Sequence, residues 1–326
     1  MSIGATELLA EEPIVEAVEL EGAEITARSP WEMFWRRFRA DRVAVVSAVF
    51  IVLLILVAVL AHPIVSLLGL PGPNQQNTNL LDAFGQPTGP SSAHPFGVDP
   101  LGRDLVSRVI YGSRVSLEVA FISTGIAVLI GVTVGVLAGY FRGWVDSLLG
   151  RLMDIVLAFP ILLLAIGFAS ACSLGHGCLG GLITTGQVTL VVVIALSSWP
   201  YIGRIVRGQT LSLREKEFVE ASRALGASNL RIMTREILPN LTAPIIVYTS
   251  LVLPTNVLYE AALSFLGVGV QPPTASWGQM IADASGSFDT TWWYMVFPGV
   301  ALVLTVLAFN LVGDGLQDAL NPKTQT

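Results

Sequence analysis

The stretch at residues 214–240 reads REKEFVEASRALGASNLRIMTREILPN and lies between two long apolar segments. Apolar residues recur at helical spacing on both sides of Gly226, which predicts two short amphipathic helices. Gly226 has no Cβ and can take the left-handed conformation that ends the first helix, and Ser228 can cap the second. Small Ala221 and Ser222 give the first helix a shallow, flat face. We therefore interpret residues 214–240 as a helix-turn-helix elbow that docks into a groove on another protein.

The composition of the chain is that of a membrane protein. Hydrophobic residues make up 53% and charged residues only 13%, and the mean hydropathy is +0.68. A helix needs about 20 residues to cross the hydrocarbon of a bilayer, and six apolar stretches approach or reach that length. We expect an all-α integral membrane protein with six transmembrane helices, at residues 43–68, 116–141, 149–171, 187–205, 241–266 and 291–313.

The segments between these spans differ in composition. The first part of the chain is rich in glutamate and predicts a solvated, disordered acidic tail. It is followed by a capping-box spacing and an aromatic, arginine-rich run, which predict an interfacial helix. The expected segments are the acidic tail at 1–28, the interfacial helix at 29–42, external segments at 69–115 and 267–290, the elbow segment at 206–240, and a second tail at 314–326.

The basic residues indicate the orientation of the spans. Of the 18 lysines and arginines, fifteen fall on the same side as the amino terminus, and only Arg103, Arg108 and Arg114 fall on the other. Cytoplasmic loops carry the excess of positive charge in membrane proteins. We therefore expect a multi-pass protein of the cytoplasmic (inner) membrane, with both termini and the elbow in the cytoplasm.

Charged residues also gather in the first external segment. Asp99, Arg103, Asp104, Arg108 and Arg114 lie at spacings that allow ion pairs along a helix. We expect a local ion-pair network on a short helix at the outer membrane surface.

Three glycines and four prolines interrupt the apolar spans. Gly131, Gly135 and Gly139 repeat a small-xxx-small spacing that lets helices approach closely, which predicts packing within the chain or against a sister subunit. The prolines are expected to kink helices, either as hinges or as adaptations of packing. They are Pro160, Pro200, Pro254 and Pro298.

One acidic residue lies well inside an apolar span, and another lies near the cytoplasmic end of a span. Glu260 lies inside an apolar span with Asn256 one turn away. Because a charge in the bilayer is costly, Glu260 must face protein or a water-filled path, and both a pathway role and a structural hydrogen bond remain open. Asp154 is one turn from Arg151, and we expect these two residues to form a structural ion pair.

The chain contains two cysteines, Cys172 and Cys178, in a short loop on the expected outer side. An oxidising exterior would permit a disulfide, and two free thiols are the alternative. A metal site with His176 is not expected, since a structural zinc site takes about four ligands.

Catalytic motifs are absent from the sequence. Its two lysines, Lys216 and Lys323, follow Glu215 and Pro322, so no phosphate-binding loop is present. The three histidines cannot form a His-Glu-x-x-His zinc pair, and no Gly-x-Ser-x-Gly motif occurs. We expect a non-catalytic subunit that does not hydrolyse ATP and binds no cofactor or metal.

The elbow resembles the EAA loop of ABC-importer permease subunits. That loop reads Glu-Ala-Ala, three residues, Gly, nine residues, Ile, one residue, Leu-Pro. Here Ser222 replaces the third small residue, and Glu236 stands where the pattern has isoleucine. The resemblance implies that the elbow is the coupling helix seated on a cytoplasmic ATPase. The residues so implicated are Glu220, Ala221, Ser222, Gly226, Ile237, Leu238 and Pro239.

Two further segments resemble the dipeptide, oligopeptide and nickel branch of these permeases. They are HPFGVDPLGRDLVSRVIYGSRVSL at residues 94–117 and LSFLGVGVQPPTASWGQMI at residues 263–281. The resemblance implies the second, C-type permease of such an importer, with the type I ABC importer permease fold.

The partners implied by the resemblance are a second homologous permease, one or two cytoplasmic ABC ATPases that hold ATP and magnesium, and an extracytoplasmic solute-binding protein. The lipid bilayer surrounds the chain, and no nucleic acid is expected. The implied substrates are dipeptides or oligopeptides, with nickel and glutathione-like compounds as alternatives.

An ion-coupled secondary transporter is the interpretation from a different class, with Glu260 as its proton or ion site. It predicts inverted internal repeats and more than one charge within the membrane. The sequence shows neither, so the importer interpretation is favoured.

Overall fold

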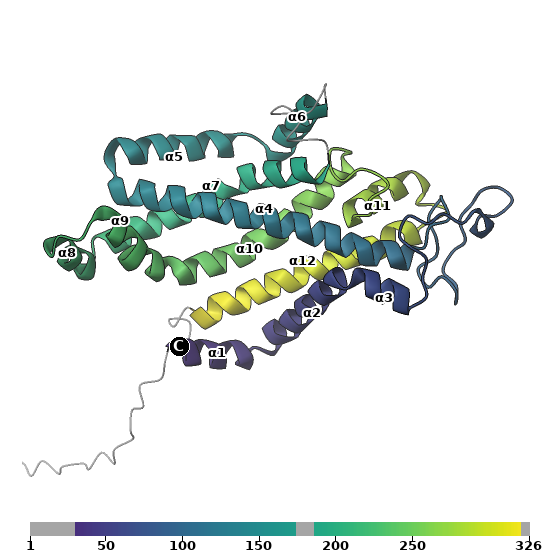
Figure 1. The fold of residues 1–326 in the computed structure, drawn as a ribbon, viewed down its shortest axis with the longest axis horizontal. Coiled ribbons are helices and arrows are strands. Elements are labelled where there is room, and N and C mark those ends of the chain that lie inside the picture. The colour runs from purple at the N-terminus through teal and green to yellow at the C-terminus, as the bar shows by residue number, and fades with distance from the viewer. Residues whose placement is uncertain (1–29, 174–185, 321–326) are drawn as a thin grey trace, which may run out of the picture.

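The computed structural model describes residues 30–173 and 186–320, and the regular elements in these two ranges are helices. The long helices lie roughly along the longest axis of the molecule (Figure 1). In chain order the elements are α1 (Pro30–Ala40), α2 (Arg42–Val59), α3 (Ala61–Leu67), η1 (Thr78–Leu80), α4 (Leu105–Phe141), α5 (Gly143–Ala158), α6 (Ile161–Ser173), α7 (Gln187–Arg214), α8 (Glu217–Ala224), α9 (Asn229–Arg231), η3 (Ile232–Ile237), α10 (Leu238–Phe265), α11 (Trp277–Ala284), η4 (Ser285–Ser287) and α12 (Trp293–Leu320).

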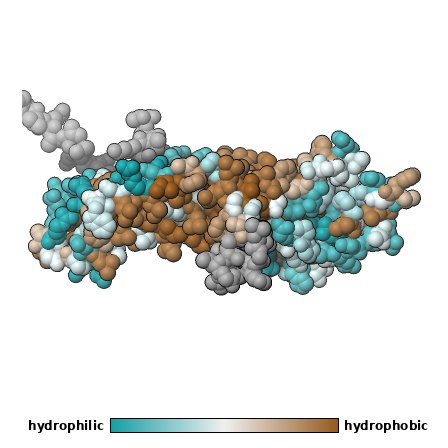
Figure 2. All heavy atoms as spheres, turned by 90° about the horizontal axis from the view of Figure 1, so that it is seen from above, coloured by the Kyte–Doolittle hydropathy of each residue, from teal (hydrophilic) through white to brown (hydrophobic). Residues whose placement is uncertain are grey.

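Five helices within the described ranges are long and apolar enough to cross a membrane, and the bent pair α5 and α6 makes a sixth if it counts as one span. The middle of the molecule is correspondingly hydrophobic, whereas both ends are largely hydrophilic (Figure 2). The all-α membrane fold expected from the sequence is therefore confirmed. The five long spans are Arg42–Val59, Leu105–Phe141, Gln187–Arg214, Asn229–Phe265 and Trp293–Leu320.

The third expected span differs from the prediction. The sequence predicted one span at 149–171 with a kink at Pro160, and the structure has two helices that begin at Gly143 and are bent by 84°. Pro160 explains the break, because a proline pushes the residue before it out of the helical region. Phe159 accordingly adopts an extended conformation, with φ −87° and ψ 129°. The other three prolines named above lie inside helices α7, α10 and α12.

The fourth helix is longer than the sequence predicted. A carboxylate oxygen of Asp104 accepts a hydrogen bond from Ser107 N at 2.9 Å and caps the start of α4. The helix therefore includes residues 105–115, which the sequence analysis assigned to an external segment. Arg108 and Arg114 thus belong to a spanning helix and not to a short surface helix.

Other boundaries also shift. Helix α12 continues to Leu320, so residues 314–320 are helical and not part of a tail. Helix α7 continues to Arg214, which shortens the elbow segment. The expected loop at 267–290 contains the helix α11, whose first turn is capped by Ser276.

The two ends of the molecule are built from different segments. Helices α8 and α9 lie at one end, which we call the elbow end (Figure 1). The segment at 70–104 lies at the opposite end, where Trp293 Nε1 donates to Val98 O at 3.1 Å. Asp99 binds Arg103 at 2.6 Å and Arg108 at 3.5 Å there, as expected. Asp104, however, contacts His94 at 2.8 Å, which the sequence analysis did not anticipate.

Helices α4 and α7 pack through the three glycines of α4. A Cβ at Gly131 would lie 2.7 Å from Trp199 O, and one at Gly135 would lie 2.6 Å from Gly203 O. A Cβ at Gly139 would lie 2.8 Å from the carbonyl oxygen of Arg207. These distances leave no room for a side chain, so the expected packing role is confirmed and the partner is this chain's own α7. We call this contact the glycine seam.

The seam predicts opposite effects for two identical substitutions on α4. Gly135→Ala would overpack the seam, which typically costs about 1–3 kcal/mol. Gly125→Ala is the matched control, because a Cβ there meets nothing within 4 Å and alanine favours a helix over glycine by about 1 kcal/mol. We expect a lower melting temperature in detergent for Gly135→Ala and an unchanged or higher one for Gly125→Ala. Equal melting temperatures would contradict the seam.

Candidate coupling and translocation site

The elbow has the geometry that its sequence predicts. Helix α8 ends at Ala224. Gly226, just beyond this end, has φ +80°, and Ala227 N donates to Ser222 O at 3.1 Å across it. Ser228 Oγ then accepts a hydrogen bond from Arg231 N at 3.4 Å and caps the second half of the elbow. Both local predictions are confirmed. A left-handed residue here is inexpensive only for glycine.

The second half of the elbow joins α10 without a break. Residues Asn229–Phe265 form one candidate span, and Ile232–Ile237 within it make a π-helical turn. A π turn holds more residues than an α turn, and here Ile237 is fully buried while Glu236 stays partly exposed. Glu236 thus departs from the EAA pattern without placing a carboxylate in the core.

The two faces of the elbow differ in character. Val219, Ile232 and Ile237 are fully buried in a core that also contains Tyr140. The opposite face leaves apolar side chains uncovered, with Leu225 88% and Leu230 67% exposed. We call the exposed set the docking face, and it consists of Phe218, Glu220, Ala221, Leu225 and Leu230. No described part of the chain covers these apolar side chains.

Polar contacts hold the elbow to the end of α4. Tyr140 Oη donates to Asn229 Oδ1 at 2.8 Å. The guanidinium of Arg214 donates to Tyr140 O and lies 5.8 Å from the centre of the tyrosine ring. Arg142 and Glu215 form an ion pair at 2.6 Å. We call these five residues the elbow lock. Sequence reasoning missed them because Tyr140 and Asn229 are 89 positions apart.

Glu260 is fully buried where α10 meets α4 and α11. Its Oε1 accepts a hydrogen bond from Ser264 Oγ at 2.9 Å, and the hydroxyl groups of Ser116 and Ser276 also interact with the carboxylate. Gly278 of α11 packs against α10 so closely that a Cβ would lie 2.6 Å from Ala261 Cα. Glu260 Oε2 has no hydrogen-bond partner among the described residues, so the carboxylate is partly satisfied, by serines of its own helix and its neighbours.

Asn256 joins three spanning helices. Its Oδ1 accepts from Ser198 Oγ of α7 at 2.8 Å, and its Nδ2 donates to Thr124 Oγ1 of α4 at 2.8 Å. All three side chains are buried. Because each polar group finds a partner, Asn256 can fix α10 against α4 and α7 inside the membrane.

Two ion pairs connect α5 to α7. Arg207 Nη2 donates to Asp146 Oδ2 at 2.8 Å, and Arg204 pairs with Asp154. The sequence analysis paired Asp154 with Arg151, and this was wrong. Arg204 lies 50 positions further along the chain, so spacing within one helix could not identify it. The question of a disulfide between Cys172 and Cys178 falls outside the described side chains.

Two family models cover most of the chain. Residues 131–326 match the binding-protein-dependent transport system inner membrane component. Residues 29–87 match the N-terminal transmembrane domain of oligopeptide transport permease C. The chain belongs to the binding-protein-dependent transport permease family. It is therefore a multi-pass membrane permease of an ABC importer, a class in which ATP hydrolysis takes place on partner subunits.

Similar proteins agree with this family. The glutathione transport system permease protein GsiD of Pectobacterium atrosepticum is 39% identical over 92% of this chain and 94% of its own. GsiD of Escherichia coli is 41% identical over 91% of both chains. An inward-facing structure of the MetNI methionine ABC transporter matches 67% of this chain and 98% of its own, with TM-score 0.56 and 22% identity. That likeness supports the permease fold.

The surroundings of Glu260 predict which substitutions the protein tolerates. Glu260→Gln keeps the shape of the side chain and an oxygen that accepts from Ser264, so we expect normal amounts of folded protein and normal ATP-driven uptake. Glu260→Leu leaves the buried serine hydroxyl without this acceptor, which costs about 1–3 kcal/mol. Folded yield and uptake by reconstituted vesicles measure both effects. Loss of uptake by a well-folded Glu260→Gln protein would instead indicate an ion-coupling residue.

Proposed function

We propose that this chain is the second permease subunit of an ABC importer for short peptides, and that its docking face sits on a cytoplasmic ATPase. The observation that carries the proposal is the elbow, whose apolar face is uncovered while its other face is locked to the spanning helices. The remaining partners would be a homologous permease and an extracytoplasmic solute-binding protein. ATP and magnesium would be bound by the ATPase, and this chain would hold no cofactor.

The elbow would lie in the cytoplasm together with both chain termini. The distribution of basic residues supports this orientation by the positive-inside rule. The last turn of α12 lies in the same half of the molecule as α1, as an even number of spans requires (Figure 1). The segment at 70–104 would then face the outside, where a delivery protein can reach it.

The elbow lock suggests how an ATPase could move the spans. Closure of the ATPase would push the docking face, and the elbow lock would pass this displacement to the end of α4. The glycine seam would carry α7 along with α4, because the two backbones are too close to slide past one another. A rigid-body movement of this kind can switch a permease between inward and outward openings.

The relatives support a peptide substrate. Those cited above are glutathione transport permeases, and glutathione is itself a tripeptide. The match of residues 29–87 to an oligopeptide permease domain points in the same direction. We therefore place glutathione and unmodified dipeptides in one candidate substrate class, and we keep a nickel complex as the competing outcome.

Two substitutions in the elbow test the coupling role. Glu220→Arg reverses a charge on the docking face, and Gly226→Pro removes the N–H that bonds Arg223 O at 3.0 Å and forbids the positive φ. We expect uptake to fall about tenfold or more, which corresponds to the loss of about 1.4 kcal/mol of interaction free energy between the elbow and the ATPase. The variant proteins should still be present in the membrane. Asp318→Arg is the control, because it also reverses a charge, at an exposed position on α12. Normal uptake by both elbow variants would overturn the coupling assignment.

Substrate uptake tests the importer assignment. A strain that lacks this chain should lose uptake of radiolabelled glutathione or of a radiolabelled dipeptide, and a plasmid copy should restore it. Nickel-63 uptake serves as the control for the competing substrate. Loss of nickel uptake alone would replace the peptide assignment, and unchanged uptake of all three would contradict both.

A further inference from the structure

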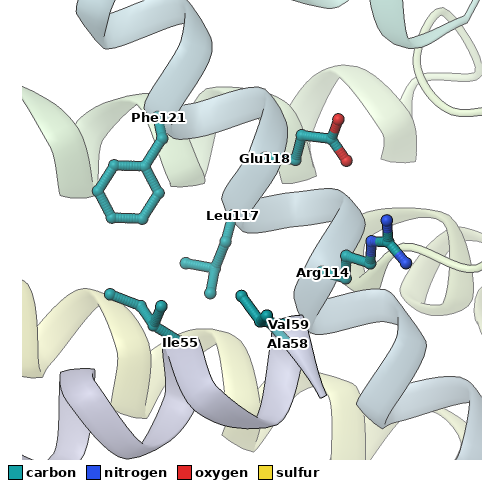
Figure 3. A pocket seen from close by; sticks show the side chains of 7 residues that line it. All are labelled: Ile55, Ala58, Val59, Arg114, Leu117, Glu118 and Phe121. Atoms are coloured by element: carbon teal, nitrogen blue, oxygen red, sulfur yellow. The ribbon is translucent and has the colours of Figure 1, made fainter. Parts of the chain in front are cut away.

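Two opposite charges stand unpaired on the outer part of α4. Arg114 and Glu118 are one helical turn apart and both are exposed. Within the described part of the chain neither side chain forms an ion pair or a hydrogen bond. Both side chains extend from the same side of the helix, and their charged ends stay apart (Figure 3). Residues at this spacing can pair with each other, but these two do not pair in the described structure, so each charged group is available to another charge.

Both charges line a cavity of about 360 Å³, a size at the lower end of small-molecule sites. Four segments that are distant in sequence form its wall, namely the external segment, α4, the start of α7 and the loop before α11. Most of the lining side chains are polar. Besides Arg114 and Glu118 they include Asn74, Tyr111, Gln187 and Thr274.

A second cavity of about 300 Å³ adjoins the same two residues. It lies between α2 and α4, and its remaining wall is apolar (Figure 3). The apolar residues are Ile55, Ala58, Val59, Leu117 and Phe121. Arg114 and Glu118 therefore lie between two cavities, of which only the first has further polar side chains in its wall.

This arrangement is unfavourable against lipid. Both residues lie on the outer part of α4, a helix long enough to cross the membrane, and wherever such a side chain meets hydrocarbon it is costly unless it faces water or a partner. The two charges cancel, so the matching ligand carries one positive and one negative group. Its body would be partly polar and partly apolar, in keeping with the two cavities.

We propose that Arg114 and Glu118 form an entry site for zwitterionic short peptides with free termini. Glu118 accepts hydrogen bonds from the peptide ammonium group, and Arg114 donates to the terminal carboxylate. The cavity lined by Asn74, Tyr111, Gln187 and Thr274 holds the peptide backbone, and the cavity between α2 and α4 takes a side chain. The proposal rests on the peptide-import function proposed above and names the chemical features that this chain would recognise.

Peptides with one blocked terminus test the two contacts separately. The sample is the intact transport complex, purified from its own membranes into lipid nanodiscs without the solute-binding protein. The ligands are radiolabelled alanyl-phenylalanine, its N-acetyl derivative and its carboxamide. Equilibrium dissociation constants are measured with and without a non-hydrolysable ATP analogue.

The two substitutions should give mirror-image results. Glu118→Gln should weaken binding of the free dipeptide about ten- to hundredfold, as expected for a hydrogen bond to a charged group, and leave the N-acetyl derivative unaffected. Arg114→Gln should weaken binding of the free dipeptide by a similar factor and leave binding of the carboxamide unaffected. Asp289→Asn is the control, because Asp289 is exposed and lines neither of these cavities.

Other results would overturn the site. They are equal weakening of all three ligands, no effect of either substitution, or no dipeptide binding by the wild-type complex up to millimolar concentration. If the variants instead lose the second permease during purification, the charges belong to a subunit interface. If the binding experiment gives one of these results while cells still take up peptides, only the entry site is contradicted. If cells that contain the chain take up no peptide, the proposed function itself is contradicted.

Discussion

The close approach of α4 and α7 is the constraint on which the other features depend. Association of helices in a membrane gains little from the hydrophobic effect, because lipid tails are as apolar as leucine. Packing must then come from close backbone contact, and three glycines one turn apart provide it along α4. The Asn256 contacts with Ser198 and Thr124 add polar bonds across the same helices and α10. Together these contacts pack α4, α7 and α10 into one unit.

Helix α4 connects the two ends of this unit. It has 37 residues and is about 56 Å long at 1.5 Å per residue. Its first turn is capped by Asp104, and its last turn carries Tyr140 of the elbow lock. One continuous helix therefore joins the elbow to the opposite end of the molecule. Glu260 and its serines strengthen the far half, because they join α10 to α4 and α11 through buried hydrogen bonds.

The parts of this structure that could be predicted from the sequence depend on local chemistry. Gly226 and Ser228 mark the two helix ends of the elbow by their own conformational preferences, and both lie where predicted. The glycine spacing identified a packing surface for the same reason. The partner of Asp154 and the elbow lock could not be predicted, since they join residues 50 to 89 positions apart. The start of α4 was also misplaced, because charges near the end of an apolar run were taken as the end of the span.

That misplacement bears on transport. Arg114 was first assigned outside the membrane, where water would make an unpaired charge unremarkable. On α4, Arg114 and Glu118 share a helix with the elbow lock, so a movement of the elbow end also moves the two charges relative to α2 and to the loop before α11. The walls of both outer cavities come from these neighbouring segments. An ATPase stroke transmitted by α4 would thus change the shape of the proposed peptide site, as alternating access requires.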